Sequence, residues 1–170
     1  MRRSLFVCLV SAIAVSACDT SLPFEPKDGD LPFPKSVVEG TGTVSELKVR
    51  RSAWLTIGPR SYRVEEQLYC FCGFGEPNPA VLEVKSAQIT RAWDRRTGAQ
   101  FAASGNQSKT IERLFDFAIE RAEAGEQIRV SYDALFGYPA VLTIGMPEVD
   151  AGVTYVLANL QVNSAGMSSY

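Results

Sequence analysis

The sequence predicts an α+β fold, in which two helices cover an antiparallel sheet of about six strands in the order helix, three strands, helix, three strands. The first observation is a segment from about Lys109 to Ala124 in which apolar side chains recur every three or four residues. The second is a series of short segments in which apolar and polar residues alternate, as in strands with one buried face. The third is that the connections are short, as hairpins between antiparallel strands require.

The first helix is expected to begin at Thr43, because Thr43-Val44-Ser45-Glu46 has the spacing of a capping box. Gly58-Pro59 should end it. Glu66 interrupts the apolar face of the strand that follows. Three strands are expected in this half, over Tyr62–Cys72, Ala80–Lys85 and Ile89–Trp93.

The second helix, Lys109–Ala124, has Ser108 as its predicted N-cap and Gly125 at its end. Its apolar stripe predicts that it lies on the sheet. Three further strands are expected over Gln127–Asp133, Ala140–Ile144 and Val153–Leu160.

The first 17 residues are typical of a bacterial lipoprotein signal peptide. Arg2 and Arg3 precede an apolar run that is too short to span a membrane, and Val15-Ser16-Ala17-Cys18 looks like a lipobox. We therefore expect cleavage before Cys18 and lipid (diacylglycerol and palmitate) on that cysteine, which anchors an exported protein to a bacterial membrane. Ordinary secretion is the alternative. Asp19 resembles the inner-membrane retention signal of enteric bacteria, but sorting rules differ between phyla, so inner and outer membrane both stay open.

Residues 18–42 are rich in proline, glycine and charge, which predicts an extended tether. This segment contains a near repeat, Leu22-Pro23-Phe24 and Leu31-Pro32-Phe33, for which docking into a partner is the alternative reading. Residues 43–160 are expected to form a single globular domain, followed by a polar tail over 161–170. Cleavage of the signal leaves 15 basic and 19 acidic residues, a net charge of -4, which argues against nucleic acid as a partner.

The chain has no histidine, which excludes Ser-His-Asp and Cys-His catalysis and imidazole metal sites. Cys70 and Cys72 are the only thiols left once the signal is removed and Cys18 is acylated. Four interpretations are open for this pair: a structural disulfide, two reduced and packed thiols, a redox-active pair, or a metal site completed by Glu66 or Glu76. No metal and no cofactor is expected.

Asp133 and Tyr138, with Glu76, could line a binding cleft near the strand ends. The stronger alternative is that Asp133 starts a turn and Gly137-Tyr138-Pro139 completes it. A weaker hypothesis is an enzyme that uses carboxylates alone, such as Glu66 or Asp133.

These residues resemble a family of bacterial envelope proteins, often lipoproteins, known as domain of unknown function family 6174. The resemblance covers about Trp54 to Leu160 and departs from the family pattern at Gly145 and at Asp150-Ala151, where acidic residues are expected. It rests on Trp54, Tyr62, Cys70-Phe71-Cys72, Pro79, Ile111, Leu114-Phe115-Asp116, Val130-Ser131-Tyr132-Asp133 and Gly137-Tyr138-Pro139. The resemblance implies a location in the cell envelope but no activity.

Together these observations predict a membrane-tethered envelope lipoprotein that acts as a non-enzymatic binding or interaction module for an envelope protein or another envelope component. The alternative is a thiol-disulfide redox protein that uses Cys70 and Cys72.

Overall fold

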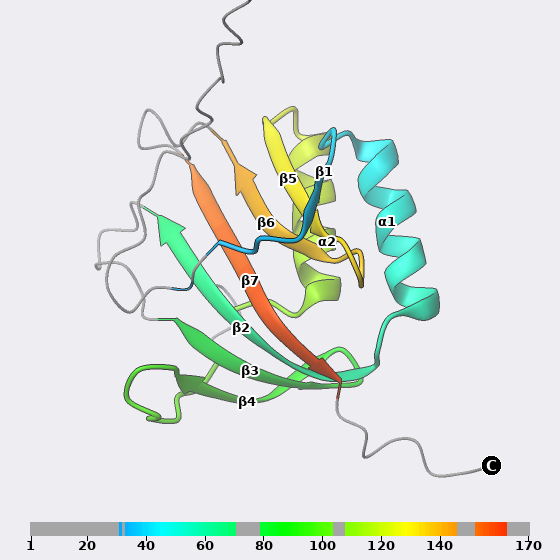
Figure 1. Ribbon diagram of the computed structural model, residues 1–170. Coiled ribbons are helices and arrows are strands. Elements are labelled where there is room, and N and C mark those ends of the chain that lie inside the picture. Colours follow the sequence, from blue (N-terminus) through cyan, green and yellow to red (C-terminus); the bar gives the residue numbers. More distant parts are fainter. Residues whose placement is uncertain (1–30, 32, 71–78, 104–107, 146–151, 163–170) are drawn as a thin grey trace, which may run out of the picture.

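The computed structural model describes residues 31, 33–70, 79–103, 108–145 and 152–162. They form one antiparallel sheet with both helices packed on the same face (Figure 1). The strand order in the sheet is β1-β5-β6-β7-β2-β3-β4. The helices are α1 (Val44–Ile57) and α2 (Ile111–Glu123). The strands are β1 (Val37–Glu39), β2 (Ser61–Cys70), β3 (Ala80–Lys85), β4 (Gln88–Asp94), β5 (Ile128–Asp133), β6 (Pro139–Ile144) and β7 (Val153–Val162).

The predicted α+β class is confirmed, but the sheet has seven strands where about six were expected. The additional strand is β1, which pairs with β5 and lies inside the segment predicted as tether. Three residues are too few to show the alternation that predicts a strand. The glycines beside β1 also have a role that linker composition does not suggest: a Cβ on Gly40 would lie 2.5 Å from Cε2 of Tyr132.

Both helices begin at a threonine. The Thr43 hydroxyl accepts a hydrogen bond from the Glu46 amide at 3.4 Å, as the predicted capping box requires. The Glu46 carboxylate differs from the standard motif, because it accepts from the amides of Thr41 and Gly42. At α2 the N-cap is Thr110 and not Ser108, and its hydroxyl accepts from the Arg113 amide at 3.2 Å.

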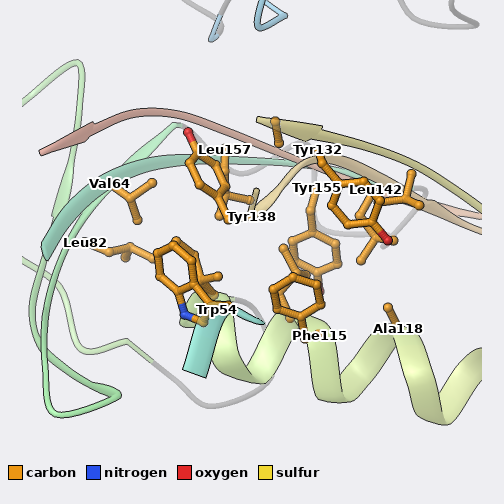
Figure 2. Close-up of a cluster of buried hydrophobic side chains, with 14 of the residues drawn as sticks. Trp54, Val64, Leu82, Phe115, Ala118, Tyr132, Tyr138, Leu142, Tyr155 and Leu157 are labelled. Carbon is orange, nitrogen blue, oxygen red and sulfur yellow. The ribbon is translucent and has the colours of Figure 1, made fainter. Parts of the chain in front are cut away.

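The helix-covered face holds the larger core, which is rich in aromatic rings (Figure 2). Trp54 of α1 meets the rings of Tyr62 and Tyr138 edge to face, with centroids 5.8 and 6.0 Å apart. Phe115 of α2 is fully buried and stacks on Tyr132. Neither described helix has the length and apolarity needed to cross a membrane.

Candidate functional site

The face of the sheet opposite the helices carries a second, smaller apolar cluster. Side chains alternate between the faces of a strand, so the neighbours of core residues in β2, β6 and β7 point away from the helices. We call this cluster the outer-face patch, and it consists of Gln67, Tyr69, Val141, Val156 and Ala158. Residues 33–36, which lead into β1, run across this side of the sheet (Figure 1).

Two residues of the predicted tether cover the outer-face patch. Leu31 is completely buried against Tyr69 and Val156, and its amide donates a hydrogen bond of 3.4 Å to Oε1 of Gln67. The ring of Phe33 lies parallel to that of Tyr69, with centroids 6.2 Å apart. The second Leu-Pro-Phe repeat is therefore bound to its own domain through Leu31 and Phe33.

Polar groups border the patch at both ends. Thr143 and Thr154 share a hydrogen bond of 3.0 Å between their hydroxyls, two residue pairs beyond Val141 and Val156 in the β6–β7 ladder. At the other end Glu65 accepts from Asn159 at 3.0 Å and pairs with Arg95 at 2.8 Å. An apolar centre with a polar rim is the usual arrangement of a protein contact surface.

Gln67 was not recognised in the sequence as a functional residue. It is only 1% exposed, and one buried side-chain amide on a strand gives little signal. A buried amide needs hydrogen-bond partners, and here one of them is the backbone of the crossing segment. Any residue except proline can donate this backbone hydrogen bond, so the apolar neighbours of Gln67 select the side chain at this position.

A buried carboxylate lies on the helix-covered face. Glu66 is 3% exposed and accepts a hydrogen bond of 3.1 Å from the Lys109 amide at the start of α2. Burial raises the pKa of Glu66 to about 7, against the opposing effects of hydrogen bonds from Lys109 and Ser108. The Lys109 ammonium, whose pKa is lowered by burial, lies 4.8 and 5.2 Å from the ring centroids of Phe117 and Tyr155.

A second carboxylate, that of Glu112, links α2 to α1 and β2 through hydrogen bonds. Glu112 of α2 accepts hydrogen bonds of 3.0 Å from Nε1 of Trp54 and from the hydroxyl of Tyr62, which itself accepts from the Ile111 amide at 2.9 Å. Burial, followed by the charge of Glu112, raises the pKa of Tyr62. A cavity of about 80 Å³ adjoins this site between Trp54, Arg60 and Glu112. Small-molecule sites usually measure several hundred Å³, so this cavity has room only for water or an ion.

Asp133 and Tyr138 are close together, but in the arrangement of a turn. The Asp133 carboxylate accepts from the amides of Leu135 and Phe136, and its own amide donates to the carbonyl oxygen of Tyr138. Tyr138 is 2% exposed and packs on Trp54. Glu66 and Asp133, the two carboxylates considered for catalysis, lie in β2 and β5, and β6 and β7 separate these strands.

Cys70 is the last residue of β2 and packs against the edge of the helix-covered core. Its predicted partner Cys72 lies outside the described residues, as do Glu76 and the predicted lipidation site Cys18.

The chain matches the family of unknown function DUF6174 over residues 46–162. The match covers most of the chain, so the protein belongs to this family, as the sequence resemblance indicated. No match was found among curated proteins or among solved structures.

Proposed function

We propose that this DUF6174 member is an exported lipoprotein, anchored through acylated Cys18 after removal of residues 1–17, and that its domain binds extended peptide segments of envelope proteins on the outer-face patch. The observation that carries the proposal is the complete burial of Leu31 in that patch. Leu31 comes from a proline-rich segment, and prolines hold such segments in an extended form that loses little entropy on binding.

The attachment of this segment is weak enough to be exchanged. Burial of a leucine side chain contributes roughly 1.5–3 kcal/mol, and ordering the backbone costs roughly 1–2 kcal/mol for every residue fixed. The hydrogen bond of the Leu31 amide and the stacked ring of Phe33 add to the favourable contribution from burial. Since these opposing contributions are similar in size, a competing segment with a leucine and an aromatic residue can replace residues 31 and 33.

The test is calorimetric titration of a synthetic peptide with the sequence of residues 29–36 into the chain that follows the signal. We expect the peptide to bind the Leu31→Ala variant more tightly than the wild type, because the internal segment then competes less. A scrambled peptide of the same composition is the control. If the peptide fails to bind a folded Leu31→Ala chain, the proposal is wrong.

The lipid anchor is tested in a bacterial host. We expect an alkyne analogue of palmitate to label the wild-type chain and not a Cys18→Ser variant, and the label to coincide with membrane fractionation. A matched Cys8→Ser variant should keep the label. Equal labelling of the Cys18→Ser variant would overturn the anchoring part of the proposal.

For Cys70 and Cys72 we propose a structural disulfide, because exported cysteines usually oxidise in pairs and because Cys70 packs against the core. The redox alternative requires the pair to cycle at an accessible potential. Intact mass after alkylation, across a series of thiol redox buffers, distinguishes the two. A bond that persists until strongly reducing conditions supports the structural disulfide, and titration at the potential of exported oxidoreductases supports redox activity.

A further inference from the structure

The tether contains a second copy of the segment that covers the outer-face patch. Leu22-Pro23-Phe24 has the same three residues as Leu31-Pro32-Phe33, and the two copies begin nine positions apart. Lysine follows each copy within a few residues, as Lys27 and Lys35. The contacts made by the second copy are a buried leucine side chain, one backbone amide and one stacked ring. None of these contacts depends on a residue that the first copy lacks.

We propose that the outer-face patch accepts either copy, so that the tether has two registers on the domain. The inference rests on the proposed function, because it takes the patch to be an exchangeable peptide site. The occupant of the alternative register is Leu22-Pro23-Phe24 of the same chain. β1 keeps its pairing with β5 in both registers, and only the chain before Val37 changes its path.

The second copy is the favoured occupant because it is nearer to β1. Three residues, 34–36, connect Phe33 to β1, whereas twelve residues, 25–36, connect Phe24 to it. The probability of closing a flexible loop falls as the 3/2 power of its length, so a fourfold longer connection lowers occupancy roughly eightfold. With equal contacts, the first copy is therefore the occupant in roughly one of every nine molecules in which the patch is occupied by the tether.

The register sets the distance between the lipid anchor and the domain. Thirteen residue steps separate Cys18 from Leu31, and four separate it from Leu22. At the ~3.1 Å per residue of an extended proline-rich chain, these spans reach about 40 Å and about 12 Å. A segment of an envelope partner that displaces both copies releases the whole tether. The domain thus has a near and a far position at the membrane, and a partner peptide can shift the balance between them.

The experiment uses the full chain that follows the signal, residues 18–170 with Cys18→Ser. The photo-crosslinking residue p-benzoylphenylalanine replaces Phe24 in one sample and Phe33 in another. Crosslinks are mapped by mass spectrometry to the strands that carry Tyr69 and Val156. We expect both positions to crosslink to these strands within one chain, with a yield at position 24 roughly one eighth of that at position 33.

Two variants make the result specific. Leu31→Ala should raise the yield at position 24 several-fold, because the favoured occupant is weakened. Leu22→Ala should remove the crosslink from position 24 while leaving the second copy and its contacts intact, which keeps the test valid if Leu31→Ala does not fold. The inference is overturned if position 24 gives no crosslink to these strands, if its crosslink survives Leu22→Ala, or if it forms only between two chains.

A competition experiment distinguishes the two-register inference from the proposed function. The peptide of residues 29–36 is added to the sample with the crosslinker at position 33. If the peptide suppresses that crosslink while position 24 never reacts, the patch is an exchangeable peptide site and the two-register inference alone is wrong. If the peptide leaves the crosslink at position 33 unchanged, the proposed function is wrong as well.

Discussion

The two faces of the sheet are closed in different ways. On the helix-covered face, 22 of the described residues form one buried cluster, drawn from both helices, from six strands and from the turn before β6. On the outer face, the second cluster has three buried residues, Leu31, Tyr69 and Val156, with Phe33, Val141 and Ala158 packed against it. Burial of the first cluster requires most elements of the domain, whereas burial of the second requires one short segment before β1.

This difference separates the fold from the binding surface. Elements distant in sequence meet in the helix-covered core, so it can open only when the domain unfolds. The segment over the outer-face patch can leave without disturbing a helix, because the described cluster that holds its leucine and phenylalanine is completed by residues of β2, β6 and β7 and by none of a helix. The outer face is therefore the place where the domain can exchange partners while it stays folded.

The largest expected effect is on the helix-covered face. Phe115→Ala should lower the free energy of unfolding by about 3–5 kcal/mol, because a fully buried ring leaves a cavity. Urea denaturation measures this loss. The matched control is Phe101→Ala, whose side chain is 40% exposed and whose loss should cost less than about 1 kcal/mol. Similar losses for the two variants would contradict the assignment of the main core.

The second prediction concerns how the stability of the helix-covered face depends on pH, through the buried carboxylate of Glu66. Its pKa of about 7 in the folded protein lies above the ordinary value of 4.5. The folded state therefore holds this proton more tightly than the unfolded chain, and stability falls as the pH rises from 4.5 through 7. The loss attributable to Glu66 is about 3 kcal/mol.

Glu66→Gln removes this titration and keeps an acceptor for the Lys109 amide. Urea midpoints measured between pH 4.5 and pH 8 should decline less steeply for Glu66→Gln than for the wild type. Parallel pH profiles for the two chains would mean that Glu66 ionises normally in the folded protein.

Leu31→Ala sharpens the comparison from the outer face. The side chain is fully buried, yet the net attachment of its segment is small, so we expect the free energy of unfolding to fall by only about 1–1.5 kcal/mol, less than for a leucine in a main core. Hydrogen exchange should speed up in the segment before β1 and stay unchanged in α2. A uniform increase in exchange over the whole domain would show that the two faces unfold together.

The smallest expected effect concerns the start of α1, which follows the chain that leads from the outer face through β1. Thr43 caps α1 directly after the segment that connects it to β1. Thr43→Ala should cost about 1 kcal/mol, because the Glu46 amide loses its acceptor. Thr43→Ser keeps a hydroxyl at the same position and is the matched control in thermal unfolding. An equal loss in the serine variant would assign the effect to packing of the threonine methyl group.

The sequence predicts the helix-covered face well and the outer face poorly, for physical reasons. Helix α2 and strands β5 to β7 carry periodic apolar residues, and periodicity reports burial on one side of an element. The covering segment has the composition of a linker, because its prolines and the glycines beside β1 are equally typical of a free chain.

The signals for the outer face were present but ambiguous. The repeat of Leu-Pro-Phe marked the covering segment, yet a repeat alone does not tell whether its apolar side chains meet a partner or their own domain. Asp133 was ambiguous in another way, since the same carboxylate that suggests a cleft also closes a turn. The covering segment depends on contacts across the sheet that spacing along the chain does not encode, whereas the contacts of Asp133 are local and agree with the turn that the sequence favoured.

The most direct test of the account is ¹⁹F NMR of the chain with 4-fluorophenylalanine at position 33, titrated with the peptide of residues 29–36. The account predicts a loss of the signal of the bound ring and growth of a signal at the position of a free ring, with saturation, while ¹⁹F-labelled Phe115 stays unchanged. A Phe33 signal that does not respond to excess peptide, or one that changes only together with Phe115 as the domain unfolds, would contradict the claim that the outer face is an exchangeable binding site.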